Sequence, residues 1–198
     1  MSAENVAVGL WVVWYVTWVA AVVWSSKTKV QMGKDMAGLH RYLAGIGCLL
    51  LFFPHGANGA LFGWAFTRPL MRALWPEPAA LKWSLLVLVA VGFGFCWWAR
   101  LHLGRLWSGF VTLKEDHRIV DTGPYRLVRH PIYTGVIFSA LMTALIKSTP
   151  VALLGFLLVA TGFWLTARIE ETFLRGQLGA EAYDAYSRKV PMLVPGFG

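Results

Sequence analysis

Charged residues are scarce in this chain: Asp, Glu, Lys and Arg together make up only 14% of its 198 residues. A soluble domain of this size carries about a quarter of such residues, so the deficit argues against a soluble globular protein. The hydrophobic share is 57% and the mean hydropathy is +0.56. This composition predicts an integral membrane protein whose partners include membrane lipids, and the 11 Trp and six Tyr suit anchoring at membrane interfaces.

Cysteine and several familiar catalytic motifs are also missing or rare. The two cysteines, Cys48 and Cys96, both lie in apolar runs, and the five histidines are scattered. We therefore expect neither a disulfide framework nor a metal site. The sequence contains no CxxC, HExxH, GxSxG or Walker A motif. The GxG at residues 92–94 lies within an apolar run, which favours close helix packing over nucleotide binding.

What the chain has instead is five apolar runs, at residues 6–24, 42–66, 83–99, 132–146 and 151–167. A span needs about 20 predominantly apolar residues, so the runs predict an all-α, polytopic membrane protein with about five transmembrane helices. Pro54 should break or end the second helix. Thr149 suits an N-cap and Pro150 the first helical position, which predicts a tight hairpin between the last two spans. A short helix over residues 180–189 should follow.

The basic residues are unevenly divided between the two sides of these spans. Residues 27–41, residues 100–131 and the C-terminal tail would share one side, and they hold 14 of the 18 Lys and Arg. The positive-inside rule then puts the N-terminus outside and the polar segments and C-terminus in the cytoplasm. This distribution favours orientation charges over a nucleic-acid-binding surface, which would need a soluble basic face. The chain divides into residues 1–99, with spans one to three, and a cytoplasm-facing catalytic region at residues 100–198.

The first polar segment, residues 102–135, ends in GPYRLVRHPIYTG. Pro131 suits the first turn of the fourth helix, which places His130 at or near the N-cap. Free backbone N–H groups follow His130, and a helix N-terminus attracts anionic groups. Arg129, with Arg126, would strengthen that attraction. Alternatively, the two arginines serve only as orientation signals.

Two tyrosines in the same stretch, Tyr125 and Tyr133, offer flat faces for an aromatic ring of a ligand. The competing interpretation is that they belong to an interfacial belt of aromatic residues.

The second polar segment, residues 168–191, begins with an acidic pair directly after an apolar run, where carboxylates are costly. Arg168, Glu171 and Arg175 are spaced to lie on one helix face, so a row of surface ion pairs is one expectation. Glu170 points to another face and has no local basic partner. It is therefore the better candidate to contact a cationic group or ribose hydroxyls.

The motifs LGRLWS, HRIVDTGPYRLVRHPIYTG, RIEETFL and GAEAYDAYSRKVPMLVP, in this order and spacing, make residues 100–195 resemble one family. It is the isoprenylcysteine carboxyl methyltransferase family of integral-membrane enzymes, with the related phospholipid N-methyltransferases. The resemblance implies the cofactor S-adenosyl-L-methionine. By position, it assigns cofactor binding to His117, Arg118, Ile119, Val120, Tyr125, His130, Pro131, Ile132, Tyr133 and Glu170.

The resemblance also implies methyl transfer to a lipophilic or membrane-partitioned acceptor. Catalytic roles fall to Arg129 or Arg168, which could orient an anionic acceptor, and to Glu171 or His130 as a base for an amine or thiol. Thr166 stands where the eukaryotic enzymes have an arginine that contacts the substrate, which leaves a prenylcysteine substrate open.

Four alternatives remain at this point. Phosphatidylethanolamine N-methylation and S-methylation of a small thiol use the same cofactor. An NADPH-dependent reductase would bind its cofactor through a similar HPxY element, but the acidic pair at residues 170–171 does not fit that class of enzyme. A small membrane transporter would use His55 and Asn58 as a polar path, and it leaves the cytoplasmic motifs unexplained.

Overall fold

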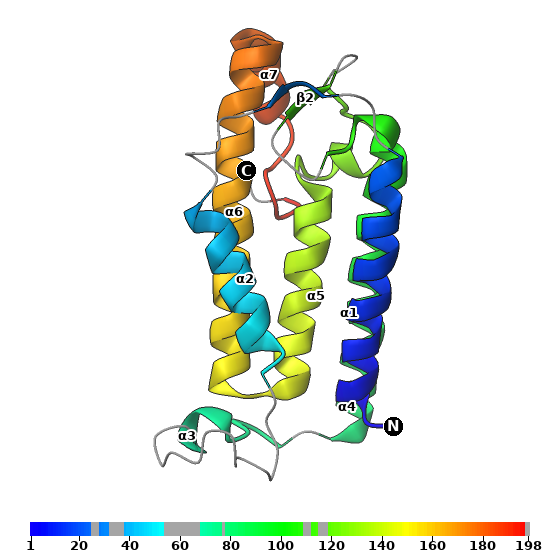
Figure 1. Cartoon of the computed structure of the whole chain (residues 1–198), viewed down its shortest axis with the longest axis vertical. Coiled ribbons are helices and arrows are strands. Elements are labelled where there is room, and N and C mark those ends of the chain that lie inside the picture. Colours follow the sequence, from blue (N-terminus) through cyan, green and yellow to red (C-terminus); the bar gives the residue numbers. More distant parts are fainter. Residues whose placement is uncertain are drawn as a thin grey trace.

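The computed structural model describes residues 1–24, 28–31, 38–53, 68–76, 78–108, 112–114 and 119–196. Its main body is a bundle of helices that run side by side along one axis (Figure 1). The bundle helices are α1 (Ala3–Ala20), α2 (Leu39–Leu51), α4 (Ala79–Leu103), α5 (Pro131–Lys147) and α6 (Pro150–Leu178). Two shorter helices are α3 (Arg68–Met71) and α7 (Ala180–Ser187).

The predicted α-helical class is confirmed, with one addition. Strands β1 (Thr28–Gln31) and β2 (Thr112–Lys114) pair antiparallel at the end of the bundle where α7 lies. These short strands were not expected, because the surrounding sequence lacks the alternation typical of half-buried strands. The pairing ties the segment after α1 to the segment after α4.

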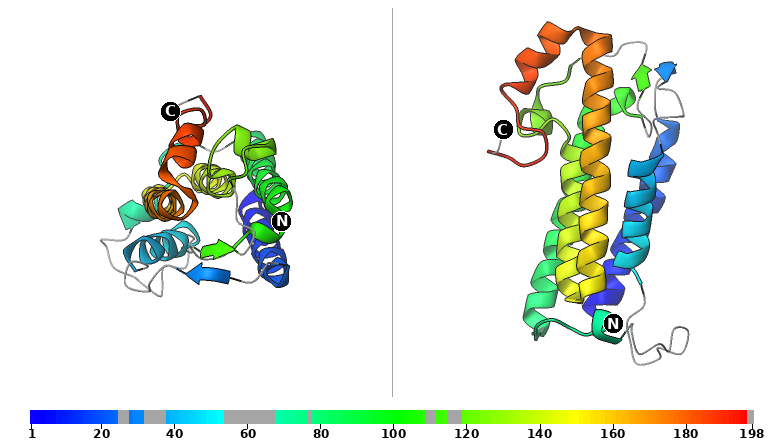
Figure 2. Two further views of the ribbon diagram at one scale, coloured as in Figure 1. Left: turned by 90° about the horizontal axis from the view of Figure 1, so that it is seen from above. Right: turned by 90° about the vertical axis from the view of Figure 1, so that its left-hand side faces the viewer.

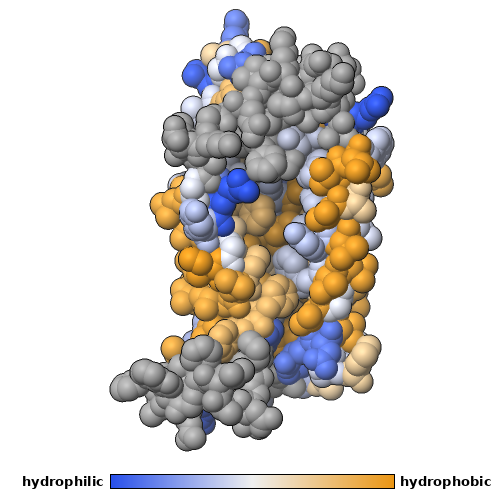
Figure 3. Space-filling view, in the orientation of Figure 1, coloured by the Kyte–Doolittle hydropathy of each residue, from blue (hydrophilic) through white to orange (hydrophobic). Residues whose placement is uncertain are grey.

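Among the described residues, three helices are long and apolar enough to cross a membrane: Ala3–Val23, Ala79–Leu106 and Pro150–Leu178. The other two apolar helices, α2 and α5, are shorter, with 13 and 17 residues. In the most apolar part of the first span only 11% of the residues are buried. Apolar side chains cover long stretches of the bundle surface (Figure 3). A surface that is apolar along its length suits lipid rather than water.

Small residues let two pairs of these helices pack closely. Between α2 and α6, a Cβ added at Gly155 would lie 2.6 Å from the Leu51 nitrogen. Between α4 and α5, a Cβ on Gly92 would lie 2.9 Å from the Gly135 carbonyl oxygen. Backbones in such close contact gain dispersion energy in a membrane, where apolar burial alone gives no advantage over lipid. The predicted packing role of the 92–94 GxG is thus confirmed at Gly92.

Helix boundaries near the hairpin agree with the predicted capping. The Thr149 side chain accepts a hydrogen bond from the Ala152 N–H, and Pro150 is the first residue of α6. His130 is the N-cap of α5, and Pro131 opens that helix. The second helix ends at Leu51, shortly before Pro54, and the remainder of the predicted second span lies outside the described residues.

The ends of the bundle differ. The N-terminus and α3 lie at one end, whereas α7, β2 and the described C-terminal segment gather at the other (Figures 1 and 2). The start of α5 and the last turns of α6 reach this second end. The two polar segments of the sequence therefore meet at one end of the bundle.

Candidate functional site

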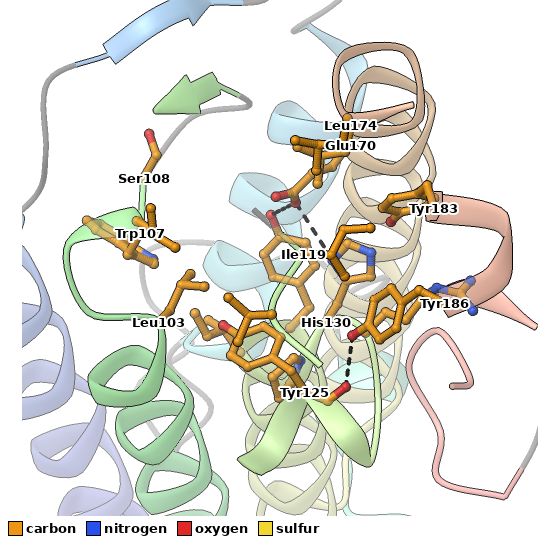
Figure 4. A pocket seen from close by; sticks show the side chains of 17 residues that line it. Leu103, Trp107, Ser108, Ile119, Tyr125, His130, Glu170, Leu174, Tyr183 and Tyr186 are labelled. Carbon is orange, nitrogen blue, oxygen red and sulfur yellow. Dashed lines mark hydrogen bonds and ion pairs between the residues drawn. The ribbon is translucent and has the colours of Figure 1, made fainter. Parts of the chain in front are cut away.

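A pocket of about 820 Å³, which includes space open to solvent, lies at this end of the bundle (Figure 4). It is bounded by the end of α4, the 3-10 turns η4 (Gly104–Leu106) and η5 (Gly123–Arg126), the start of α5, the end of α6, and α7. Its lining combines tyrosines and aliphatic side chains with one histidine, one arginine and one glutamate, so it offers apolar surface with few charged groups.

The His130–Tyr133 pair forms one polar wall. Their rings stack with centroids 5.2 Å apart and an interplanar angle of 2°. The Tyr133 hydroxyl donates a 2.7 Å hydrogen bond to Glu170 Oε2, and His130 Nδ1 lies 3.7 Å from the same oxygen. The Glu170 carboxylate is thus oriented from α5 while it lines the pocket. This geometry brings the two predicted elements, HPxY and the acidic pair, into direct contact.

Glu171 faces a different set of partners. The Arg129 guanidinium donates two hydrogen bonds to its carboxylate, from Nε at 2.6 Å and from Nη2 at 3.1 Å. His130 Nε2 lies 3.1 Å from Glu171 Oε1. Glu171 is not among the described lining residues. Its carboxylate therefore stands behind His130 and holds the imidazole from the side away from the pocket.

Arg129 also binds the end of α7 and the segment that follows it, residues 187–192. Its Nη1 donates to the carbonyls of Ser187 at 2.9 Å and Val190 at 2.5 Å. The Arg129 backbone N–H donates to the Pro191 carbonyl at 2.9 Å, and the His130 N–H donates to Met192 at 3.1 Å. The backbone N–H groups of Arg129 and His130, directly before α5, are thus bound by the chain itself, and the N–H groups expected to be free lie after His130.

Tyr125, on the η5 turn, also lines the pocket. Gly123 begins this turn with a φ of +56°, and a Cβ there would lie 2.7 Å from the His102 ring. Only glycine suits both the conformation and the space. The Tyr186 hydroxyl donates a 2.8 Å hydrogen bond to the Tyr125 carbonyl, which fixes α7 to the turn.

Tyr125 is 8% exposed. Burial, reinforced by Glu170, raises the pKa of Tyr125, and Arg100 offsets part of this effect. The phenol is therefore a neutral hydrogen-bond donor at physiological pH.

Most of the predicted site residues come together. The described lining includes nine of them: Ile119, Val120, Tyr125, Arg129, His130, Pro131, Ile132, Tyr133 and Glu170. His117 and Arg118 lie outside the described residues. Arg168 is exposed, and its guanidinium lies 5.8 Å from the Trp164 ring rather than at the pocket.

The expected row of Arg168, Glu171 and Arg175 is wrong. Arg175 pairs with Asp184 of α7 through bonds of 2.7 and 2.8 Å, and Glu171 pairs with Arg129. Helical spacing alone identified neighbours on α6, but residues from α7 and the start of α5 offered charged groups in better geometry.

Sequence reasoning missed about half of the described lining: Leu103, Leu106, Trp107, Ser108, Leu174, Leu178, Tyr183 and Tyr186. The leucines carry no distinguishing signal, since such residues also fill helix cores. The tyrosines in AYDAY lie at i and i+3, which was a detectable sign that one face of α7 is buried. Tyr183 is in fact 5% exposed.

The described lining suits an amphipathic organic ligand better than a metal ion. No group of three or more His, Cys, Asp or Glu with metal-binding geometry occurs in the described part of the chain. Glu170 supplies one carboxylate for an ammonium or hydroxyl groups. The tyrosine rings and the aliphatic side chains supply flat and apolar surface.

The isoprenylcysteine carboxyl methyltransferase (ICMT) family matches residues 85–175. A probable protein-S-isoprenylcysteine O-methyltransferase of Oryza sativa subsp. indica is 33% identical over 114 residues, 56% of this chain and 59% of that protein. The Schizosaccharomyces pombe protein-S-isoprenylcysteine O-methyltransferase is 37% identical over 101 residues, 49% of this chain and 42% of the relative.

The protein of the same name in Saccharomyces cerevisiae is 36% identical over 95 residues, 46% of this chain and 39% of the relative. The chain thus spans less than two thirds of the length of each of these relatives. The matched region contains the end of α4, η5, α5 and most of α6, which supply much of the pocket. Over residues 85–175 the chain is therefore similar to the isoprenylcysteine carboxyl methyltransferase family, which confirms the resemblance that the motifs indicated.

Proposed function

We propose that this protein is a membrane methyltransferase that uses S-adenosyl-L-methionine and methylates a carboxylate on a lipophilic acceptor. The observation that carries the proposal is the Tyr133–Glu170 contact in a pocket at the end of an apolar bundle. The contact fixes a carboxylate next to aromatic and aliphatic surface, the combination that a cationic nucleoside cofactor needs.

The residues present fit the cofactor. One Glu170 oxygen accepts from Tyr133, which leaves the other for an ammonium group or ribose hydroxyls. Tyr125 and Tyr183 offer aromatic faces, and Ile119, Val120 and Ile132 offer aliphatic contacts. When bound, S-adenosyl-L-methionine supplies a methyl group already activated by its sulfonium. The protein therefore has mainly to orient the two reactants and exclude water.

The chemical class of the acceptor depends on whether the pocket supplies a base. A carboxylate is deprotonated at neutral pH and needs no base. An amine or thiol acceptor would need one, but Glu171 is gripped by Arg129 and shares a hydrogen bond with His130. The Glu171 carboxylate is therefore engaged by the chain itself, and only His130 Nδ1, on the side of Glu170, is left as a candidate base. The loss of Glu171 as a base favours carboxyl methylation, which needs none, over N- and S-methylation.

The orientation in the membrane is part of the proposal. We place the N-terminus outside and the pocket on the cytoplasmic side, where most Lys and Arg of the sequence lie. Two cysteine variants test this in intact cells with a membrane-impermeant maleimide. Ser2→Cys should react directly, and Arg188→Cys only after permeabilisation. The reverse pattern would invert the orientation.

Cofactor binding is tested first, by calorimetry on the purified protein in detergent or lipid discs. S-adenosylhomocysteine should bind with a Kd of roughly micromolar or tighter. NADPH serves as the comparison, because the reductase alternative predicts the opposite preference. Binding of NADPH with no binding of S-adenosylhomocysteine would reject the methyltransferase proposal.

Acceptor class is tested with cofactor radiolabelled in the methyl group. The acceptors are a prenylcysteine with a free carboxylate, its methyl ester, phosphatidylethanolamine and a small thiol. Only the free carboxylate should be labelled, and mild base should release the label as methanol. Base-stable label in lipid or thiol would overturn the carboxylate assignment while leaving methyl transfer intact.

A further inference from the structure

Arg100 is a buried cation without a carboxylate partner in the described part of the chain. It lies near the end of α4 and is 0% exposed. Its guanidinium donates to three carbonyls: Gly104 at 2.7 Å, Ala21 at 2.8 Å and Trp24 at 3.0 Å. Burying a charge is costly, and these three bonds, all made by Nη1 and Nη2, offset part of that cost while the buried Nε has no partner among the described residues.

Two of those carbonyls, Ala21 and Trp24, lie at the start and just after the end of the 3-10 turn η1 (Ala21–Val23), which follows α1 directly. Carbonyls at the end of a helix carry partial negative charge, which a nearby cation stabilises. Arg100 therefore binds the end of α1 and its following turn from a different helix. The described lining of the pocket contains no residue from α1. Any effect of α1 on the pocket must therefore pass through residues that contact both, such as those around Arg100.

Aromatic rings complete the surroundings of Arg100. The centroid of the Trp107 ring lies 4.4 Å from the guanidinium carbon, and that of Trp24 lies 5.2 Å away. Such distances are those of cation–π contacts. Trp107 also packs edge-on against Trp18 of α1, with centroids 5.5 Å apart. Trp107 lines the pocket, so one of its walls is held between Arg100 and α1.

The Gly104 carbonyl links Arg100 to the start of the same wall. Gly104 has a φ of +58° and a ψ of −128°, and here α4 gives way to the η4 turn. Arg100 Nη1 holds this carbonyl in place. Leu106, the last residue of the turn, lines the pocket, and so do Trp107 and Ser108 directly after it. Figure 4 labels Trp107 and Ser108.

We propose that Arg100 is a positioning residue, which fixes the pocket wall at residues 103–108 to the end of α1. It contacts no ligand itself. Only arginine suits the position, because its planar fork reaches several carbonyls while its face stacks on an indole. The role in cofactor binding rests on the proposed function, but the fixing of the wall does not.

Arg100→Met removes the guanidinium group and its charge but keeps a long, unbranched apolar side chain. Arg105→Met is the matched control, since Arg105 is exposed on η4 and absent from the described lining. Hydrogen exchange in lipid discs should show faster exchange at residues 20–24 and 103–108 in R100M but not in R105M. Calorimetry should show S-adenosylhomocysteine binding weakened about tenfold in R100M and unchanged in R105M.

A double-mutant cycle with Trp107→Leu separates positioning from general stability. If Arg100 acts through Trp107, R100M should weaken binding much less in the W107L background than in the natural protein. Fully additive effects, or normal affinity in the folded fraction of R100M, would overturn the proposal.

Arg100→Lys and Trp24→Leu keep the proposal testable if R100M does not fold. Each removes part of the contact set, and both should accelerate exchange at residues 103–108. Exchange and affinity unchanged in both variants would reject the role of Arg100. If the natural protein does not bind S-adenosylhomocysteine, the proposed function fails, and the exchange comparison of R100M with R105M still decides the positioning role.

Discussion

Tyr133 and Glu170 are joined by a 2.7 Å hydrogen bond between the Tyr133 hydroxyl and Glu170 Oε2, which connects the first turn of α5 to α6. The two residues come from separate polar segments of the sequence. Their contact defines the orientation of the only carboxylate among the described lining residues of the pocket.

Glu170→Gln should weaken S-adenosylhomocysteine binding at least tenfold without unfolding the protein. The amide keeps an oxygen for Tyr133 but loses the charge that favours a cationic ligand group, a change of about 1–3 kcal/mol. Calorimetry and thermal unfolding in detergent measure the two effects. Glu181→Gln, an exposed carboxylate on α7, is the control and should bind normally. Equal affinity of both variants would contradict a ligand role for Glu170.

Arg129→Met should lower the free energy of unfolding by roughly 3 kcal/mol, because it leaves Glu171 mostly buried without its partner. It also frees the carbonyls of Ser187 and Val190. Limited proteolysis should then cut residues 187–193 faster. Arg126→Met, exposed on the neighbouring turn, should leave both properties unchanged. Normal protease resistance in R129M would show that the segment is held by its backbone bonds alone.

Gly155→Ala should destabilise the bundle by about 1–3 kcal/mol, since the new Cβ meets backbone atoms of α2. Gly176→Ala on the same helix is the comparison. A Cβ there meets nothing within 4 Å, and alanine favours a helix by about 1 kcal/mol over glycine. Thermal unfolding in detergent should rank G155A below the natural protein and G176A at or above it. The opposite ranking would reject the α2–α6 contact.

Alkaline pH should release α7 from the η5 turn. Burial raises the pKa of Tyr186, whose hydroxyl donates to the Tyr125 carbonyl. Because the pKa of Tyr186 is raised in the folded state, the stabilisation from its hydrogen bond is fully present below the pKa of an unfolded tyrosine, about 10. That stabilisation is lost as the pH rises further. The unfolding temperature of the natural protein should therefore fall more steeply above about pH 10 than that of Tyr186→Phe. Parallel curves would show that this phenol does not contribute.

Local patterns predicted the helices and the parts of the site that depend on one segment. Apolar runs, Thr149 with Pro150, and His130 with Pro131 each specify a helix or its first turn through short-range physics. The HPxY element and the acidic pair could be placed at one end of the bundle by following the chain through its spans. The described structure agrees in each of these cases.

Partners of individual side chains could not be predicted in the same way. Glu171 has basic residues at helical spacing, yet it pairs with Arg129 from another element. The choice depends on where α7 and the start of α5 lie in space, which no spacing encodes. Arg100 looked like one more orientation charge, and only its burial among carbonyls and indoles distinguishes it.

The length of α6 has a consequence for kinetics. Its 29 residues extend roughly 44 Å, whereas the hydrocarbon core of a bilayer is about 30 Å thick. With Pro150 at one boundary of the hydrocarbon core, Glu170, 20 residues later and roughly 30 Å along the helix, would lie at the opposite boundary. An acceptor anchored in the bilayer would meet the pocket by diffusing in two dimensions. Turnover would then follow the mole fraction of acceptor in the lipid, and adding inert lipid would slow the reaction even at a constant bulk concentration.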